Sequence, residues 1–145
     1  MVLLTKNIKE IRNSLIEFCP QIFHKHPVQF GYLYGSYSTG AVHPFSDLDI
    51  AVYSVPASKR ENMMLELMLA LEIDQKLPDE VKSEVRVINA LPLLVKGQIV
   101  TTGILIYSRD DTLRVDFETS VRGMYFDFLP SIRNYERDYL DSALF

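Results

Sequence analysis

The sequence predicts a single α/β domain in which a sheet packs against helices. The chain has 145 residues, a length typical of one domain. Its composition, 48% apolar and 23% charged, is that of a folded globule rather than of a disordered chain. Segments with the period of a helix alternate with short segments rich in aromatic and β-branched residues, as expected for strands joined by helices. We therefore predict one domain over residues 1–145.

The first half of the chain predicts a helix and two strands. Apolar residues recur at three- and four-residue steps over 5–19, which is typical of an amphipathic helix, and Pro20 is expected to end it. Residues 28–36 are rich in aromatic residues and lead into a Gly-Ser turn, and residues 47–55 become apolar after two aspartates. Both segments indicate strands. A short helix is expected to begin at about Ser36, in the connection between them.

The second half continues the alternation. The predicted elements are a helix over 58–76, a strand over 83–90, a helix over 91–103, a strand over 104–108 and a helical segment over 111–145 that is interrupted or bent near Pro130. Met63, Met64 and Met68 form a stripe on the first of these helices. We expect this stripe to lie in the core, although methionine also suits adaptable partner surfaces. The aromatic and acidic segment from Tyr125 to Tyr139 is open to two interpretations, a helix packed on the sheet or a partner-facing surface.

Charge and cysteine content exclude several classes of protein. The 15 basic and 19 acidic side chains give a net charge of −4, which argues against a protein that grips a nucleic-acid backbone. A single cysteine excludes a disulfide framework and a cysteine-based zinc site. No apolar run is long enough to span a membrane, and the first residues lack the features of a secretory signal. We expect a cytoplasmic protein with no membrane and no direct nucleic-acid partner.

Residues 31–53 contain the pattern that carries chemistry. Asp47 and Asp49 open a strand and point to the same side of it, with Leu48 on the other. Two ionised carboxylates this close are unfavourable in a core, but they suit a hard cation such as Mg²⁺, which takes carboxylate oxygens, water and substrate phosphates as ligands. At the end of the preceding strand, Gly35 lets the backbone approach a ligand, and the Ser36 hydroxyl and nearby amides can donate to phosphate oxygens. Alone, the acids indicate a solvated strand start and the Gly-Ser a turn; together they predict transfer from a nucleoside triphosphate.

The spacing of these residues resembles a known family. Gly35-Ser36, ten further residues and then Asp47-x-Asp49 match the signature of nucleotidyltransferases related to DNA polymerase β. The chain looks most like the minimal nucleotidyltransferases (MNT proteins), antitoxins of HEPN-domain toxins. The segments 83–107 and 125–135 resemble the later strands and the C-terminal helix of those proteins. The resemblance implies a small α+β nucleotidyltransferase core, a mixed sheet flanked by helices.

The resemblance also implies a site and a partner. A third carboxylate comes from the next core strand in this family, and it falls on Glu84, where many relatives carry Asp. Asp47, Asp49 and Glu84 would then be catalytic and bind Mg²⁺, while Gly35 and Ser36 would bind the nucleotide. The alternative for Glu84 is an ion pair with Arg86 or Lys82 at a solvated strand end. The implied activity is transfer of AMP from ATP to a hydroxyl, a tyrosine for example, of a cognate HEPN toxin, in a hetero-oligomer with it.

Two other functions stay open from the sequence. The chain can be a nucleotidyltransferase-fold module with an idle site that neutralises its toxin by binding. It can also be a small-molecule nucleotidyltransferase, but such enzymes usually add an acceptor-binding domain, for which 145 residues leave little space. The short chain therefore favours an acceptor surface supplied by another protein.

Overall fold

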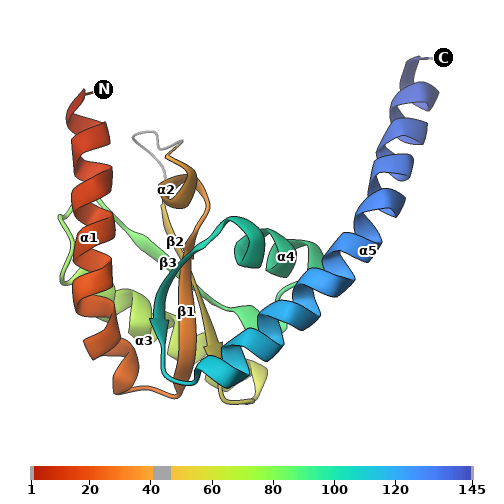
Figure 1. The fold of residues 1–145 in the computed structure, drawn as a ribbon. Helices are drawn as coiled ribbons and strands as arrows, with labels where there is room; N and C mark the ends of the chain where they lie inside the picture. The colour runs from red at the N-terminus through yellow and green to blue at the C-terminus, as the bar shows by residue number, and fades with distance from the viewer. Residues whose placement is uncertain (1, 41–46, 145) are drawn as a thin grey trace.

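The computed structural model describes residues 2–40 and 47–144, in which helices cover both faces of a four-stranded sheet (Figure 1). The elements are α1 (Val2–His24), β1 (Val28–Tyr34), α2 (Ser36–Thr39), β2 (Leu48–Ser54), α3 (Lys59–Asp74), β3 (Ser83–Val87), the 3₁₀ turn η1 (Ile88–Ala90), α4 (Leu93–Thr102), β4 (Ile104–Ser108) and α5 (Asp111–Leu144). This order confirms the predicted alternation, including the short helix that begins at Ser36.

The sheet is mixed, which confirms the predicted fold class. Its strands lie in the order β3-β2-β1-β4. Strand β1 is antiparallel to both β2 and β4, whereas β2 and β3 are parallel. The register places Asp49 between Tyr34 on β1 and Glu84 on β3. Three residues from distant parts of the sequence therefore lie side by side across three strands.

Each face of the sheet has its own apolar layer. The larger cluster joins α1 and α3 to one face, with fully buried side chains such as Leu15, Ile50 and Leu69. The smaller cluster lies on the other face, where Phe30 and Ile99 are buried beneath α4 and the first turns of α5. Side chains alternate between the faces of a strand, so Tyr34, Asp49 and Glu84 share the face of the smaller cluster.

Helix α1 is longer than predicted, because Pro20 does not end it. A proline inside a helix costs about 3 kcal/mol. The apolar stripe of α1 continues beyond it, however, and Ile22 and Phe23 are both buried against the sheet. Burying two such side chains stabilises the fold by roughly 1.5–3 kcal/mol each, which offsets the proline. Helix α5 likewise runs through Pro130 as one element.

The prediction that the methionine stripe of α3 lies in the core is wrong. Met63, Met64 and Met68 are about half exposed, while α3 buries its opposite side through Leu65 and Leu69. Helix α3 is apolar on both sides, and periodicity alone does not tell which side faces the sheet. Ser58 caps the start of α3, where its hydroxyl accepts a hydrogen bond from the Glu61 amide at 3.2 Å.

The strand predicted over 83–90 ends early, at Val87, and a 3₁₀ turn follows. There the Asn89 side chain takes the place of a backbone partner. Its amide nitrogen donates to the Ser54 carbonyl at 3.0 Å, and its oxygen accepts from the Ser54 amide at 3.1 Å. A side chain thus completes the pairing at the end of β2. Among the residues described, no helix is long and apolar enough to cross a membrane.

Candidate active site

Gly35 and Asp49 are in close contact where β1 ends and β2 begins. Gly35 has φ 71° and ψ −151°, a backbone conformation that residues with a side chain rarely adopt. A Cβ atom added at Gly35 would overlap the Asp49 carboxylate. The backbone angles therefore require a glycine here, and a side chain at this position would also force the Asp49 carboxylate to turn aside. The structure brings the two halves of the predicted motif, the Gly-Ser turn and the acidic pair, directly together.

Three carboxylates meet at this point. Asp49 is half-buried on β2, Asp47 is exposed just before that strand, and Glu84 is the register partner of Asp49 on β3. Partial burial, and then the negative charges of Glu84 and Asp47, raise the pKa of Asp49 to about 6. Leu48, between the two aspartates, is fully buried on the other face, as the alternation of a strand predicts.

Glu84 is held by a neighbour on its own strand. Arg86 donates to Glu84 Oε1 from Nη2 at 2.7 Å and from Nε at 3.1 Å. This is the ion pair that the sequence offered as the alternative for Glu84. Both side chains are about half exposed, so the pair is weak and can open. Glu84 is thus close enough to Asp49 for their charges to interact, while its carboxylate is occupied by a guanidinium.

Tyr34 is a part of the site that the sequence reasoning missed. It directly precedes Gly35 and pairs with Asp49 in the β1–β2 register. Burial and the negative charge of Asp49 raise the pKa of Tyr34 to about 12, so its phenol is neutral. The two strands are antiparallel neighbours, so their residues can be paired one by one starting from the loop that joins them. This pairing sets Tyr34 opposite Asp49 and would have identified Tyr34 from the sequence.

The turn that carries Ser36 is fixed by hydrogen bonds and burial. The Gly35 carbonyl accepts from the amides of Ser38 and Thr39 at 3.1 and 3.2 Å, and from the Ser38 hydroxyl at 2.9 Å. Tyr37 is buried against α1, and Arg12 Nε of that helix donates to the Tyr37 carbonyl at 2.5 Å. Ser36, the first residue of α2, is half-buried. The backbone around the Gly-Ser turn is therefore already ordered.

The donor set fits a hard divalent cation, although no complete metal cage is formed. Within residues 2–40 and 47–144, no group of three histidine, cysteine, aspartate or glutamate side chains is arranged to hold a metal ion. The negative charges of Glu84 and Asp47 nevertheless help to raise the pKa of Asp49, and a bound Mg²⁺ would relieve this repulsion. Glu84 could become a ligand of the same cation only after its hydrogen bonds with Arg86 break. That these three residues bind metal remains a prediction.

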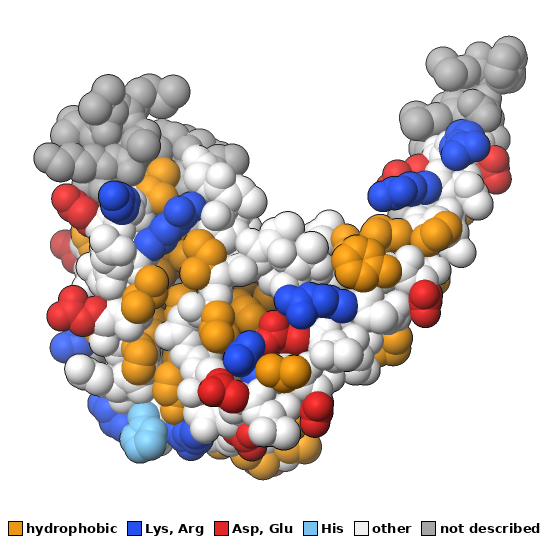
Figure 2. Space-filling view, viewed as in Figure 1, with side chains coloured by type: hydrophobic (Ala, Val, Ile, Leu, Met, Phe, Trp, Pro, Cys, Tyr) orange, Lys and Arg blue, Asp and Glu red, His pale blue; other side chains and the backbone are white. Residues whose placement is uncertain are grey.

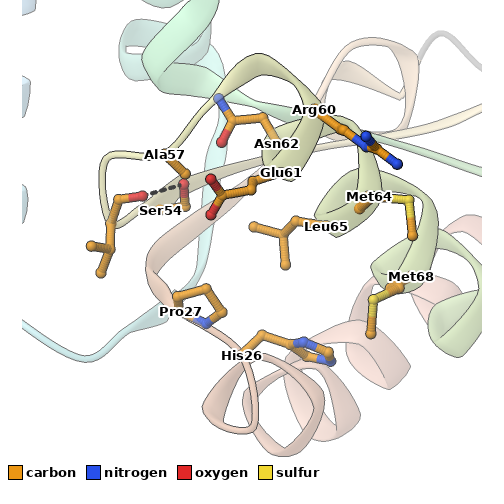
Figure 3. Close-up of a pocket in the computed structure, with 11 residues that line it drawn as sticks. His26, Pro27, Ser54, Ala57, Arg60, Glu61, Asn62, Met64, Leu65 and Met68 are labelled. Atoms are coloured by element: carbon orange, nitrogen blue, oxygen red, sulfur yellow. Dashed lines mark hydrogen bonds between the residues drawn. The ribbon is translucent and has the colours of Figure 1, made fainter.

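A separate surface pocket lies at the other end of β2 and contains none of these residues. Its volume is about 360 Å³, and it lies between the α1–β1 turn, the end of β2 and the start of α3 (Figure 3). Methionine and leucine side chains of α3 line one wall, and the Ser54 hydroxyl donates to the adjacent Val55 carbonyl at 3.1 Å. At its edge, His26 Nε2 lies 2.9 Å from Glu72 Oε2. The pocket is therefore separate from the candidate active site.

This combination of fold and site defines a class of protein. The family model described as "Polymerase beta, Nucleotidyltransferase" matches residues 17–112, and the chain belongs to this family. The match covers β1, the Gly-Ser turn, the acidic pair and β3, so the family resemblance inferred from the motif is confirmed. A search of curated proteins found no match.

Solved structures with the same fold come from toxin–antitoxin complexes. One is a toxin–antitoxin crystal structure with AMP-PNP, with a TM-score of 0.67 and 20% identity, covering 86% of this chain and 98% of that chain. Another contains a tri-AMPylated Shewanella oneidensis HEPN toxin in complex with MNT antitoxin, with a TM-score of 0.58 and 18% identity over 95% of this chain and 97% of that chain. A third, toxin–antitoxin MntA-HepT, has a TM-score of 0.59 and 15% identity over 97% and 99% of the two chains. At these identities the likeness establishes the fold.

Proposed function

We propose that this protein is an antitoxin that transfers AMP from ATP, with Mg²⁺, to a hydroxyl of a cognate HEPN toxin, a tyrosine for example, and so neutralises it. The observation that carries the proposal is the contact between Gly35 and Asp49, with Glu84 as the register partner of Asp49. This contact supports the proposal, because nucleotidyl transfer needs a turn that can bind phosphate beside carboxylates that can hold a metal ion. The family match supports transferase chemistry. The complexes with AMP-PNP and with a tri-AMPylated HEPN toxin support the nucleotide and the acceptor.

The residues of the site have distinct roles in this proposal. Gly35 lets the turn approach the triphosphate, and the Ser36 hydroxyl donates to its β- and γ-phosphate oxygens. Asp47 and Asp49 would hold Mg²⁺, which supplies positive charge against the triphosphate and polarises the α-phosphate. Tyr34, the neutral register partner of Asp49 on β1, is the candidate to orient that carboxylate. The nucleotide is thereby held with its α-phosphate toward the open side of the site.

Transfer is an in-line displacement at the α-phosphorus. The acceptor oxygen forms a bond to phosphorus while the bond to the β-phosphate oxygen breaks, so pyrophosphate leaves and AMP stays on the acceptor. The acceptor hydroxyl gives up its proton, and Glu84 is the candidate base once Arg86 releases it. The freed Arg86 is then available to an anionic group in the site.

A radiolabel experiment tests the proposal. The chain is incubated with Mg²⁺, ATP labelled at the α-phosphate and a HEPN protein, sought first in the reading frames next to its own, and label on the HEPN protein is measured. Asp47→Asn and Asp49→Asn should each abolish labelling, and EDTA should do the same to the unaltered protein. Glu17→Gln, the same change of carboxylate to amide at an exposed position on α1, is the matched control and should label normally. Full labelling by both aspartate variants would refute the enzymatic role.

A second candidate function is neutralisation by binding with an idle site. The ion pair between Glu84 and Arg86 favours it, because the third carboxylate is occupied. Growth of cells that express the toxin separates the two. If Asp47→Asn and Asp49→Asn lose labelling and protection together, the protein acts as an enzyme. If they protect cells as well as the unaltered protein does, it acts by binding.

A further inference from the structure

The distal half of α5 extends away from the rest of the molecule. Helix α5 begins at the end of the sheet opposite α2 and runs obliquely past α4 (Figure 1). Its first turns are firmly seated: Glu118 is buried and accepts from Arg114 at 2.5 Å and from Arg122 at 3.4 Å. Beyond that point, residues 124–138, termed here the α5 arm, project toward the end of the molecule that carries the candidate active site.

One apolar stripe continues from the seated part of α5 into the arm. Phe117 and Val121 pack within the domain. Met124, Phe128 and Tyr135 follow at helical steps, and at 100° per residue all five lie within about 60° of one another around the helix. Met124, Phe128 and Tyr135 are 51%, 47% and 72% exposed. The face that α5 buries against its own domain is thus left uncovered along the arm by the described part of the chain.

A firm contact with the rest of the domain lies where the arm begins. The Tyr125 ring packs on Gly97 of α4 so closely that a Cβ at Gly97 would overlap it. This contact fixes the direction in which α5 leaves the domain. The arm is therefore a continuation of a seated helix rather than a free peptide, which lowers the entropy cost of binding a partner.

The charges beside the stripe indicate the kind of partner. Asp116 and Asp127 are eleven residues apart, about three helical turns, so they lie on the same edge of the stripe. Ser120 and Ser131 occupy the same edge, and neither is charged. In an antiparallel pair of two such arms, like edges would face each other and the aspartates would repel. A partner with Lys or Arg along its rim is complementary instead.

The arm also borders an open region beside the site. The space-filling view shows the molecule hollowed between α5 and the part that carries α1 and α2, with hydrophobic side chains of α5 at the border (Figure 2). A protein seated in this hollow and held by the arm would approach the end of the sheet that carries Gly35 and Asp49. Binding of the partner to the arm would then also bring its acceptor hydroxyl to the candidate active site.

We propose that the α5 arm is the docking surface for the acceptor protein, whose apolar groove receives Met124, Phe128 and Tyr135 and whose basic rim faces Asp116 and Asp127. The inference rests on the proposed function in that the docked protein is the HEPN acceptor. Few interface residues dominate binding, and they are large buried side chains near its centre. Phe128 and Tyr135 are such residues.

The helix offers a matched control. Phe126 is 53% exposed, almost the same as Phe128, but it points to the opposite side of α5. Phe128→Ala and Phe126→Ala therefore remove the same side chain from the same exposed helix and change helix propensity equally. Both positions are exposed, so both variants should fold, which circular dichroism checks.

Calorimetric titration of the full chain with its HEPN protein, without nucleotide, tests the proposal. Phe128→Ala and Tyr135→Ala should each raise Kd about 30-fold, the effect of a central interface residue, whereas Phe126→Ala should change it less than about 2-fold. Asp127→Lys should slow association at low salt, because it reverses the charge facing the basic rim. Equal effects of Phe128→Ala and Phe126→Ala would overturn the proposal, as would unchanged binding by Phe128→Ala.

Two further measurements separate this inference from its alternatives. Asp49→Asn should bind the HEPN protein normally without transferring AMP, so a failure of transfer chemistry and a failure of docking give different results. Sedimentation of the chain alone tests whether a second copy of the chain, rather than the HEPN protein, covers the apolar stripe of the arm. A dimer that Phe128→Ala, but not Phe126→Ala, converts to a monomer would show that a second copy covers the arm, and would overturn the proposed partner.

Discussion

Replacement of Gly35 by alanine tests the central contact of the site. The backbone of Gly35, at φ 71° and ψ −151°, lies in a region essentially restricted to glycine, and holding alanine there costs about 1–3 kcal/mol. The new methyl group would also overlap Oδ2 of Asp49, at the end of a side chain that can turn aside, and moving that carboxylate off its rotamer costs about 0.5–1.5 kcal/mol more. We expect Gly35→Ala to lower the free energy of unfolding by about 3 kcal/mol, from the sum of backbone strain and overlap.

Gly40→Ala is the matched control. Gly40 also has a positive φ, 87°, but no described atom lies within 4 Å of a Cβ built there. This variant therefore adds backbone strain without overlap, and it should cost only about 1 kcal/mol. The difference between the two variants combines the greater backbone strain at Gly35 with the contact with Asp49, and the double-variant cycle separates the two.

Urea unfolding of four proteins completes the test: the unaltered chain, Gly35→Ala, Asp49→Ala and the double variant. Once the Asp49 carboxylate is removed, Gly35→Ala should cost only its backbone strain, so the cycle should give a coupling of about 0.5–1.5 kcal/mol. AMP transfer should fall in Gly35→Ala and persist in Gly40→Ala. Additive effects in the cycle, or equal destabilisation by both glycine variants, would refute the close approach of the turn and the carboxylate.

Three further predictions follow from other parts of the structure. Asp49→Asn should abolish AMP transfer and raise the melting temperature of the nucleotide-free protein. The melting temperature should rise because burial and neighbouring acids disfavour the ionised form of this carboxylate, and a lower melting temperature would contradict this. The thiol of Cys19, fully buried and with its pKa raised to about 12 by burial, should react with Ellman's reagent at pH 8 only after unfolding, and rapid labelling of the native protein would count against the seating of α1. Glu118→Ala should destabilise the protein by about 3 kcal/mol in urea titrations, because it leaves Arg114 and Arg122 without their shared acceptor; an effect as small as that of an exposed acid would show that this network does not seat α5.

Local signals predicted most of the fold and part of the site. The helical periods and the strand composition are properties of neighbouring residues, so the order of elements could be predicted directly from the sequence. The Gly35-Ser36 turn and the Asp47-x-Asp49 pair also lie within one short stretch. Their positions were therefore predicted correctly, and their chemical roles remain predictions for the experiments above.

The failures of sequence reasoning concern burial between distant segments. Pro20 is a helix breaker by local rules, but Phe23 and the sheet beneath it keep α1 intact. The outward position of Met64 depends on which side of α3 meets the sheet. No local pattern carries either fact, since both are decided by packing against strands far along the chain.

The sequence by itself determined the alternation of helices and strands, the family and the pairing of a Gly-Ser turn with two aspartates, because each depends on residues close together in the chain. Only the tertiary structure decided that Gly35 touches the Asp49 carboxylate, that Arg86 holds Glu84, and that the apolar face of α5 extends beyond its own domain. These depend on strand register and helix seating. Both are set by the burial of apolar surface across the whole molecule, which no single segment specifies.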